Sequence, residues 1–143
     1  MNDLKLNVVL HSSNPKKLKN ADIYLVDTYG ETKKFYNCSD VVFMGKSLVG
    51  KGGQNPLEPA RHGAAVLHGP NINNFLDIYT LLDKLKITYK VNGATSLTNL
   101  VNKLIIKPKN KKGYLKIEKI GKKILNETKD EINSLLNNEI KKT

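Results

Sequence analysis

Long apolar runs are missing from this sequence. No stretch of about 18 consecutive apolar residues occurs, which predicts no transmembrane helix. The first residues, MNDLKLNVVLHSS, lack the basic and then apolar segments of a signal peptide. The single cysteine, Cys38, excludes an internal disulfide and fits a reducing compartment. Because His11, His62 and His68 have no metal-ligand spacing, we interpret them as ordinary surface or loop residues and expect no metal site.

Arginine is also scarce, although the chain is strongly basic. Arg61 is the only arginine, and the formal net charge is +11. Residues 103–143 hold 12 Lys against 5 Asp or Glu, so most of the excess lies in the tail. Proteins that read nucleic acid usually rely on arginine, so we expect no nucleic-acid partner. The basic tail still leaves open a second interpretation, a basic module that binds nucleic acid or an anionic membrane.

A glycine-rich loop, GKSLVGKGGQN at residues 45–55, lies at the centre of the chain. Its glycines let the backbone turn tightly and approach a ligand closely. Asn55 is a good N-cap and Pro56 suits a first helical turn, which predicts a short helix over residues 56–62. Free N–H groups at such a helix start often bind phosphate, and Glu58 there could accept hydrogen bonds from sugar hydroxyls. Taken alone, the loop fits a plain strand–loop–helix connection equally well.

Strands and helices alternate along the chain. Strands are predicted at residues 4–10, 22–27, 41–45, 64–69 and 87–91. Helices are predicted at residues 31–38, 56–62, 73–85, from 95 or 96 to 104, 113–125 and 127–141. The alternation indicates an α/β fold, a Rossmann-like parallel sheet with helices on both faces. The second strand is apolar enough to predict burial on both faces.

The alternation also bounds the predicted domains. No first strand carrying its own glycine loop is found, so the chain matches the later part of a Rossmann-like domain. We assign residues 1–106 to a partial Rossmann-like domain. Residues 107–143 are then Lys-rich C-terminal helices that pack on the same domain.

A motif run extends over residues 39–75 and consists of Ser39-Asp40, Phe43, Gly45, Ser47-Leu48, Gly52-Gly53, NPLEP at 55–59, Gly63, Val66-Leu67, Gly69-Pro70 and Asn74-Phe75. With these residues the stretch resembles the C-terminal domain of 3-deoxy-D-manno-octulosonic acid (Kdo) transferases, lipid A glycosyltransferases of the two-domain GT-B fold. Upstream, DTYGE at residues 27–31 is similar to the family's D-T-x-GE segment. A double glycine followed by NPLEP at this spacing is a specific signal.

The resemblance implies transfer of Kdo from CMP-Kdo to the lipid A precursor in lipopolysaccharide biosynthesis. It also implies a peripheral enzyme at the cytoplasmic face of the bacterial inner membrane, without a cofactor. The implied donor-binding residues are Tyr29, Gly30, Glu31, Gly52, Gly53, Asn55, Pro56, Leu57 and Glu58. Glu58 would accept hydrogen bonds from the ribose, Asn55 would face the phosphate, and the backbone of residues 29–31 would border the cytosine.

The chain also departs from the family pattern. The family's N-terminal acceptor domain, which carries the catalytic general base, has no counterpart in this sequence. No catalytic residue is therefore assigned, and we expect the chain alone to be inactive. Lys46 stands where the family has glycine, and Gln54 and Asn71 stand where it has histidine. A related GT-B enzyme that uses a different nucleotide sugar is a further alternative.

Overall fold

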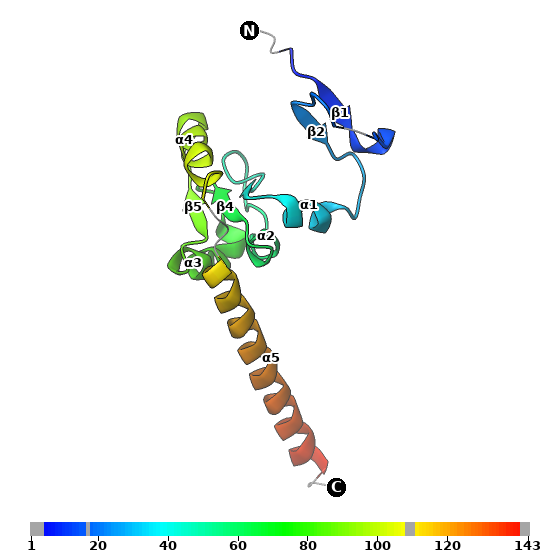
Figure 1. The fold of residues 1–143 in the computed structure, drawn as a ribbon. Helices are drawn as coiled ribbons and strands as arrows, with labels where there is room; N and C mark the ends of the chain where they lie inside the picture. Colours follow the sequence, from blue (N-terminus) through cyan, green and yellow to red (C-terminus); the bar gives the residue numbers. More distant parts are fainter. Residues whose placement is uncertain (1–4, 17, 108–110, 141–143) are drawn as a thin grey trace. The chain divides into compact units, whose positions relative to one another are not determined.

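The computed structural model describes residues 5–16, 18–107 and 111–140. The chain divides into two compact units, Met1–Phe35 and Tyr36–Thr143 (Figure 1). The break that the sequence predicts at Pro108 lies outside the described residues.

The first unit contains a two-stranded parallel sheet. Strands β1 (Val8–Leu10) and β2 (Ile23–Leu25) pair in register, with a short 3-10 helix η1 (His11–Ser13) between them. Helix α1 (Thr32–Cys38) follows and runs across the boundary between the units. The predicted burial of β2 on both faces is wrong, because Ile23 and Leu25 are 41% and 49% exposed. An apolar run is buried on both sides only where layers of chain cover both faces, and sequence alone does not supply those layers.

The second unit is built on a three-stranded parallel sheet in the order β3-β4-β5. The strands are β3 (Val41–Phe43), β4 (Ala65–His68) and β5 (Thr88–Lys90). The helices are α2 (Leu57–Arg61), the 3-10 helix η2 (Asn73–Phe75), α3 (Leu76–Lys84), α4 (Ala94–Leu104) and α5 (Lys111–Ile140). The predicted α/β class with parallel strands is therefore confirmed.

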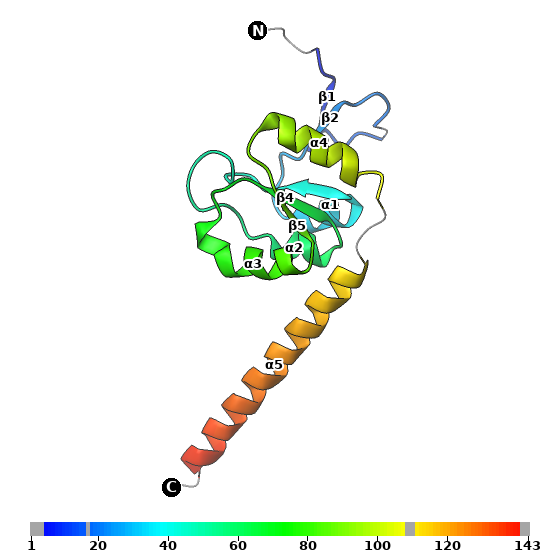
Figure 2. The same cartoon turned by 90° about the vertical axis from the view of Figure 1, so that its left-hand side faces the viewer.

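Helices cover both faces of this sheet. Successive side chains of β4 point to opposite faces, so this strand contributes to the buried cluster on each side. Val66 packs on one side in a buried cluster with Ala60 of α2, Leu82 of α3 and Ile117 of α5. Met44, directly after β3, and Ile87, directly before β5, complete this cluster. Leu67 packs on the other side with Val91 and Leu104, together with partly buried residues of α4. Figure 2 shows α4 on one side of the strands and α2 and α3 on the other.

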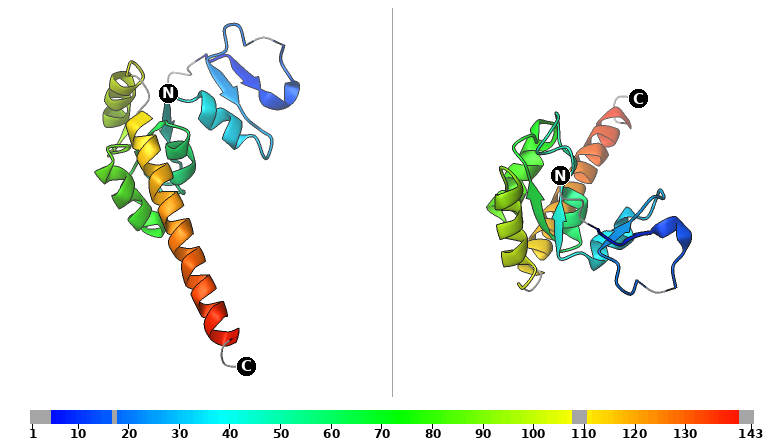
Figure 3. Two further views of the ribbon diagram at one scale, coloured as in Figure 1. Left: turned by 60° about the horizontal axis from the view of Figure 1, so that its bottom comes forward. Right: turned by 90° about the horizontal axis from the view of Figure 1, so that it is seen from above.

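The two predicted C-terminal helices are one continuous helix, α5, of 30 residues. The prediction separated them at Asn126, where the apolar spacing is interrupted, but no proline or glycine lies there to end a helix. Ile117 near its start is buried in the core, whereas residues 121–138 are exposed. Figure 3 shows the later part of α5 extending away from the sheet of its own unit. Among the described residues, no helix has both the length and the apolar content needed to cross a membrane.

His68 is buried at the end of β4, so the interpretation of all three histidines as surface or loop residues is wrong for this one. Its side chain is 6% exposed, and its Nδ1–H donates to the carbonyl of Gly69 at 2.7 Å. The ring lies 4.4 Å from that of Tyr79, centroid to centroid. Burial lowers the pKa of His68 below its ordinary value, Lys90 lowers it further, and the Gly69 bond and Asp83 oppose the shift.

This burial predicts a pH dependence of stability. Because the folded pKa is lowered, the unfolded chain binds a proton on His68 that the folded chain does not. The free energy of unfolding should therefore fall as the pH drops from about 7.5 to about 5.5. Urea titrations at both pH values measure this difference, and His68→Phe, which keeps a ring against Tyr79, should reduce it. An unchanged pH difference in that variant would contradict the assignment.

Candidate functional site

A cavity of about 370 Å³ lies in the second unit, where β3 ends. Ligands of parallel α/β proteins collect at this edge, beyond the carboxyl ends of the strands. The lining combines apolar groups with an amide pair, a carboxylate and a phenol. The residues are Tyr36, Val42, Phe43, Met44, Gly45, Gln54, Asn55 and Glu58.

Asn55 and Glu58, two residues of the NPLEP motif, meet at this cavity. The Leu57 N–H donates to Asn55 Oδ1 at 3.0 Å, so this side chain holds the start of α2. The helix begins one residue later than the sequence predicts, at Leu57, and Glu58 is in its first turn. Burial raises the pKa of Tyr36, and the negative charge of Glu58 raises it further. The cavity thus offers a carboxylate acceptor and a protonated phenol to a polar ligand.

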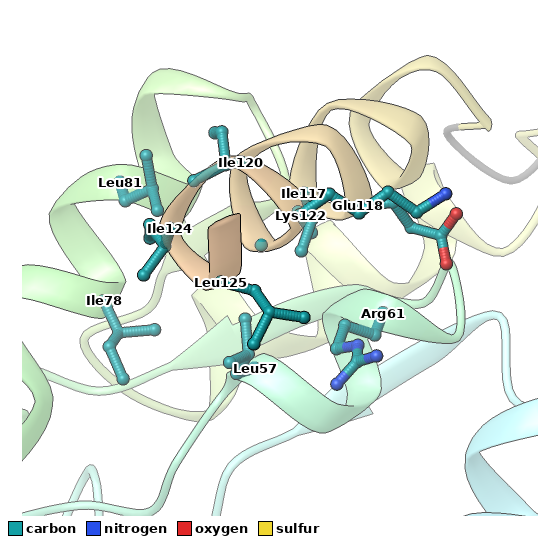
Figure 4. Close-up of a pocket in the computed structure, with 11 residues that line it drawn as sticks. Leu57, Arg61, Ile78, Leu81, Ile117, Glu118, Ile120, Lys122, Ile124 and Leu125 are labelled. Atoms are coloured by element: carbon teal, nitrogen blue, oxygen red, sulfur yellow. The ribbon is translucent and has the colours of Figure 1, made fainter. Parts of the chain in front are cut away.

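Pro56 and Leu57 contribute packing rather than cavity lining. Pro56 is fully buried, and Leu57 packs against the core cluster around Val66. Leu57 also lines a separate groove of about 470 Å³ beside α5, shown in Figure 4. That groove is mostly aliphatic, with Ile78, Leu81, Ile117, Ile120, Ile124 and Leu125 among its lining residues. Its lining fits a nucleotide less well than the smaller and more polar cavity does.

Gly52 and Gly53 are not among the residues that line the cavity, and they let the loop approach another part of the chain. Their φ angles are +94° and +65°, in the region that favours glycine. A Cβ on Gly52 would collide with the Asn74 side chain, and one on Gly53 would lie 2.6 Å from the Asn71 carbonyl oxygen. Lys46, which replaces a family glycine, has a φ of +58°, a conformation that costs a non-glycine residue about 1 kcal/mol.

Tyr29, Gly30 and Glu31 belong to the first unit and follow β2. Tyr29 is fully exposed, and Gly30 has a φ of +86°. The Glu31 carboxylate forms an ion pair with the Lys34 ammonium at 2.8 Å, and this contact lowers the pKa of Glu31 against the opposing effect of burial. Asp27, at the start of this segment, accepts hydrogen bonds from the Ser12 N–H at 2.9 Å and from the Ser12 hydroxyl at 2.5 Å.

Sequence reasoning missed several lining residues of the cavity. Phe43 and Gly45 follow from their place at the end of a predicted strand, where a site is expected. Gln54 could also have been predicted, because it directly precedes Asn55, the first residue of the NPLEP motif. Tyr36 carried none, because only the folded chain brings it to the cavity that Val42 and Phe43 line. Within the described ranges, no group of three or more His, Cys, Asp or Glu side chains could hold a metal ion.

Curated proteins similar in sequence are Kdo transferases. The chain is 31% identical over 133 residues to the 3-deoxy-D-manno-octulosonic acid transferase of Haemophilus influenzae, covering 92% of this chain and 30% of that protein. It is 32% identical over 129 residues to the enzyme of the same name from Rickettsia prowazekii, covering 85% of this chain and 28% of the relative. The chain therefore spans less than a third of the length of these relatives. No protein-family model matches it.

A solved structure shares the fold. The C-terminal CMP-Kdo binding domain of WaaA from Acinetobacter baumannii superimposes with a TM-score of 0.69 at 24% sequence identity. The match covers 78% of this chain and 58% of that domain's chain. This likeness confirms the fold that the sequence predicts. The chain is homologous to the 3-deoxy-D-manno-octulosonic acid transferases and corresponds to their C-terminal part.

Proposed function

We propose that this chain is the donor-binding part of a Kdo transferase, which holds CMP-Kdo while Kdo passes to the lipid A precursor. One observation carries the proposal: Asn55 and Glu58 of the NPLEP motif line a single cavity at the carboxyl end of β3. The similar proteins are named for Kdo transfer and for CMP-Kdo binding, which supports the choice of donor.

The proposed contacts follow from the chemistry of the side chains. Glu58 accepts hydrogen bonds from the two ribose hydroxyls of CMP, for which a carboxylate offers two oxygens. Asn55 uses Oδ1 to hold Leu57, so its amide nitrogen is the group that it offers to a phosphate oxygen. Gly52, Gly53, Pro56 and Leu57 shape the loop and anchor α2. For Tyr29, Gly30 and Glu31, a contribution to cytosine binding rests on the family resemblance.

The proposed chemistry needs groups outside this chain. No residue here is assigned the role of the general base, so the chain alone should not transfer Kdo. We place acceptor binding and catalysis in an N-terminal domain of the complete enzyme, which would act in lipopolysaccharide biosynthesis at the cytoplasmic face of the inner membrane. A peripheral contact with anionic lipid would use the Lys-rich tail. The alternative of a basic binding module without sugar chemistry finds no support among the related proteins.

An NMR titration with CMP, and with UMP as the matched control, tests this function. We expect amide shifts at Gln54, Asn55 and Glu58 that saturate with CMP and are weaker with UMP. The reason is that a base-specific site distinguishes the cytosine amino group from the uracil carbonyl. A well-dispersed spectrum that does not change with CMP, or that responds equally to both nucleotides, would contradict the proposal.

A further inference from the structure

We propose that Tyr79 is a positioning residue of the donor site: its hydroxyl holds the Gln54 carbonyl and so fixes the end of the glycine-rich loop that carries Asn55. This inference rests on the proposed function, because it concerns the same cavity. Tyr79 is not among the cavity-lining residues, so it would act through the loop and not by touching the donor.

The contact joins segments that are 25 residues apart in sequence. Tyr79, in α3, is 2% exposed, and its hydroxyl donates to the Gln54 carbonyl oxygen at 3.1 Å. Burial raises the pKa of Tyr79 to about 12, so the hydroxyl keeps its proton and stays a donor at neutral pH. Its ring packs on the buried His68 ring at 4.4 Å, which limits where the hydroxyl can point. A rigid ring therefore holds a carbonyl next to the motif.

The beginning of the loop is fixed by a different set of bonds. Ser47 is fully buried, its hydroxyl donates to the Met44 carbonyl at 2.5 Å, and it accepts the Gly69 N–H at 2.8 Å. The Ser47 carbonyl accepts the Asn71 N–H at 2.9 Å, and the Asn71 side chain donates to the Leu48 carbonyl at 3.2 Å. These bonds hold residues 47 and 48 against the segment after β4.

The last residues of the loop, Gln54 and Asn55, must be held in a defined orientation at the cavity. Between its ends the chain has positive φ angles at Gly50, Gly52 and Gly53, where glycine gives the backbone little intrinsic stiffness. Gln54 and Asn55 are both exposed and both line the cavity. The Tyr79 hydroxyl bonds to Gln54, directly before Asn55. This hydrogen bond therefore limits the positions that the Asn55 amide can take before the donor binds. Binding then loses less conformational freedom than it would with an untied loop.

Tyr79→Phe tests this role, because it removes the hydroxyl and keeps the ring against His68. The matched control is Tyr89→Phe, which deletes a hydroxyl that donates to the Lys86 carbonyl at the same distance, 3.1 Å, away from the cavity. In Tyr79→Phe we expect lower backbone amide order parameters at residues 52–55. We also expect CMP affinity to fall by roughly 3- to 10-fold, the value of one ordinary hydrogen bond. Tyr89→Phe should change neither quantity.

If Tyr79 had only a structural role, Tyr79→Phe would unfold at a lower urea concentration, but the order parameters of the loop and the CMP affinity of the folded protein would not change. That result, or wild-type values of both readouts in Tyr79→Phe, would overturn the proposal. If the wild-type chain does not bind CMP, the proposed function fails and the order parameters alone decide whether Tyr79 fixes the loop. The two failures are therefore distinguishable.

Discussion

Replacing Glu58 by alanine is expected to weaken CMP binding by roughly 10- to 100-fold. Hydrogen bonds to a charged group contribute about 1.5–3 kcal/mol, and each 1.4 kcal/mol corresponds to about a tenfold change in affinity. Glu58 is exposed at the cavity in the first turn of α2, so its loss removes acceptors without opening a hole in the core. The fold should therefore persist while the ribose hydroxyls lose their partner.

The measurement is the dissociation constant of CMP from the titration proposed above. Glu58→Gln separates charge from shape, because it keeps one acceptor oxygen, and it should bind with an affinity between those of the wild type and Glu58→Ala. Glu127→Ala is the control for removal of a negative charge, since Glu127 is exposed on α5 and pairs only weakly with Lys123 at 3.6 Å. Equal affinities of Glu58→Ala and the wild type would remove Glu58 from the site.

Gly69→Ala should lower the free energy of unfolding by about 3 kcal/mol, the upper end of the usual cost of overpacking. Gly69 is buried directly after β4, and its N–H donates to the Ser47 hydroxyl. A Cβ at this position would overlap the backbone carbonyl of Ser47 and lie 2.6 Å from the Leu48 Cα. These are backbone atoms held by their own hydrogen bonds, so they cannot rotate away as a side chain can. The φ of Gly69 lies outside the left-handed region, so the requirement is for space and not for a special conformation.

Urea unfolding of Gly69→Ala against Gly121→Ala gives a matched comparison. Gly121 is in the exposed part of α5, with open space around its Cβ position, and there alanine should stabilise the helix by about 0.5–1 kcal/mol. If Gly69→Ala does not fold, Ser47→Ala tests the same contact, because it leaves the Gly69 N–H without its acceptor at a cost of about 1–3 kcal/mol. Wild-type stability of both variants would show that the segments are not in close contact.

The local pattern of the sequence predicted most of the fold. Each predicted strand has a counterpart within its predicted bounds. Alternation, apolar runs and glycine or proline stops involve only residues that are close in sequence, so they can be read without the tertiary structure. The helix at residues 73–85 was also predicted, and the structure shows η2 followed by α3 there. Where burial depends on a covering layer, local pattern was insufficient. It predicted too much burial for β2 and too little for His68.

The sequence by itself determined the family, since NPLEP after a double glycine is a chemical signature that needs no coordinates. It also predicted Asn55 and Glu58 as donor-binding residues, and both line one cavity in the structure. Only the tertiary structure brought Tyr36 to the same cavity and joined Tyr79 to Gln54, because these contacts link residues far apart in the chain. It also showed that Gly52 and Gly53 approach Asn74 and Asn71. A glycine pattern indicates that another group approaches the backbone closely, but only the packing of the chain shows which group it is.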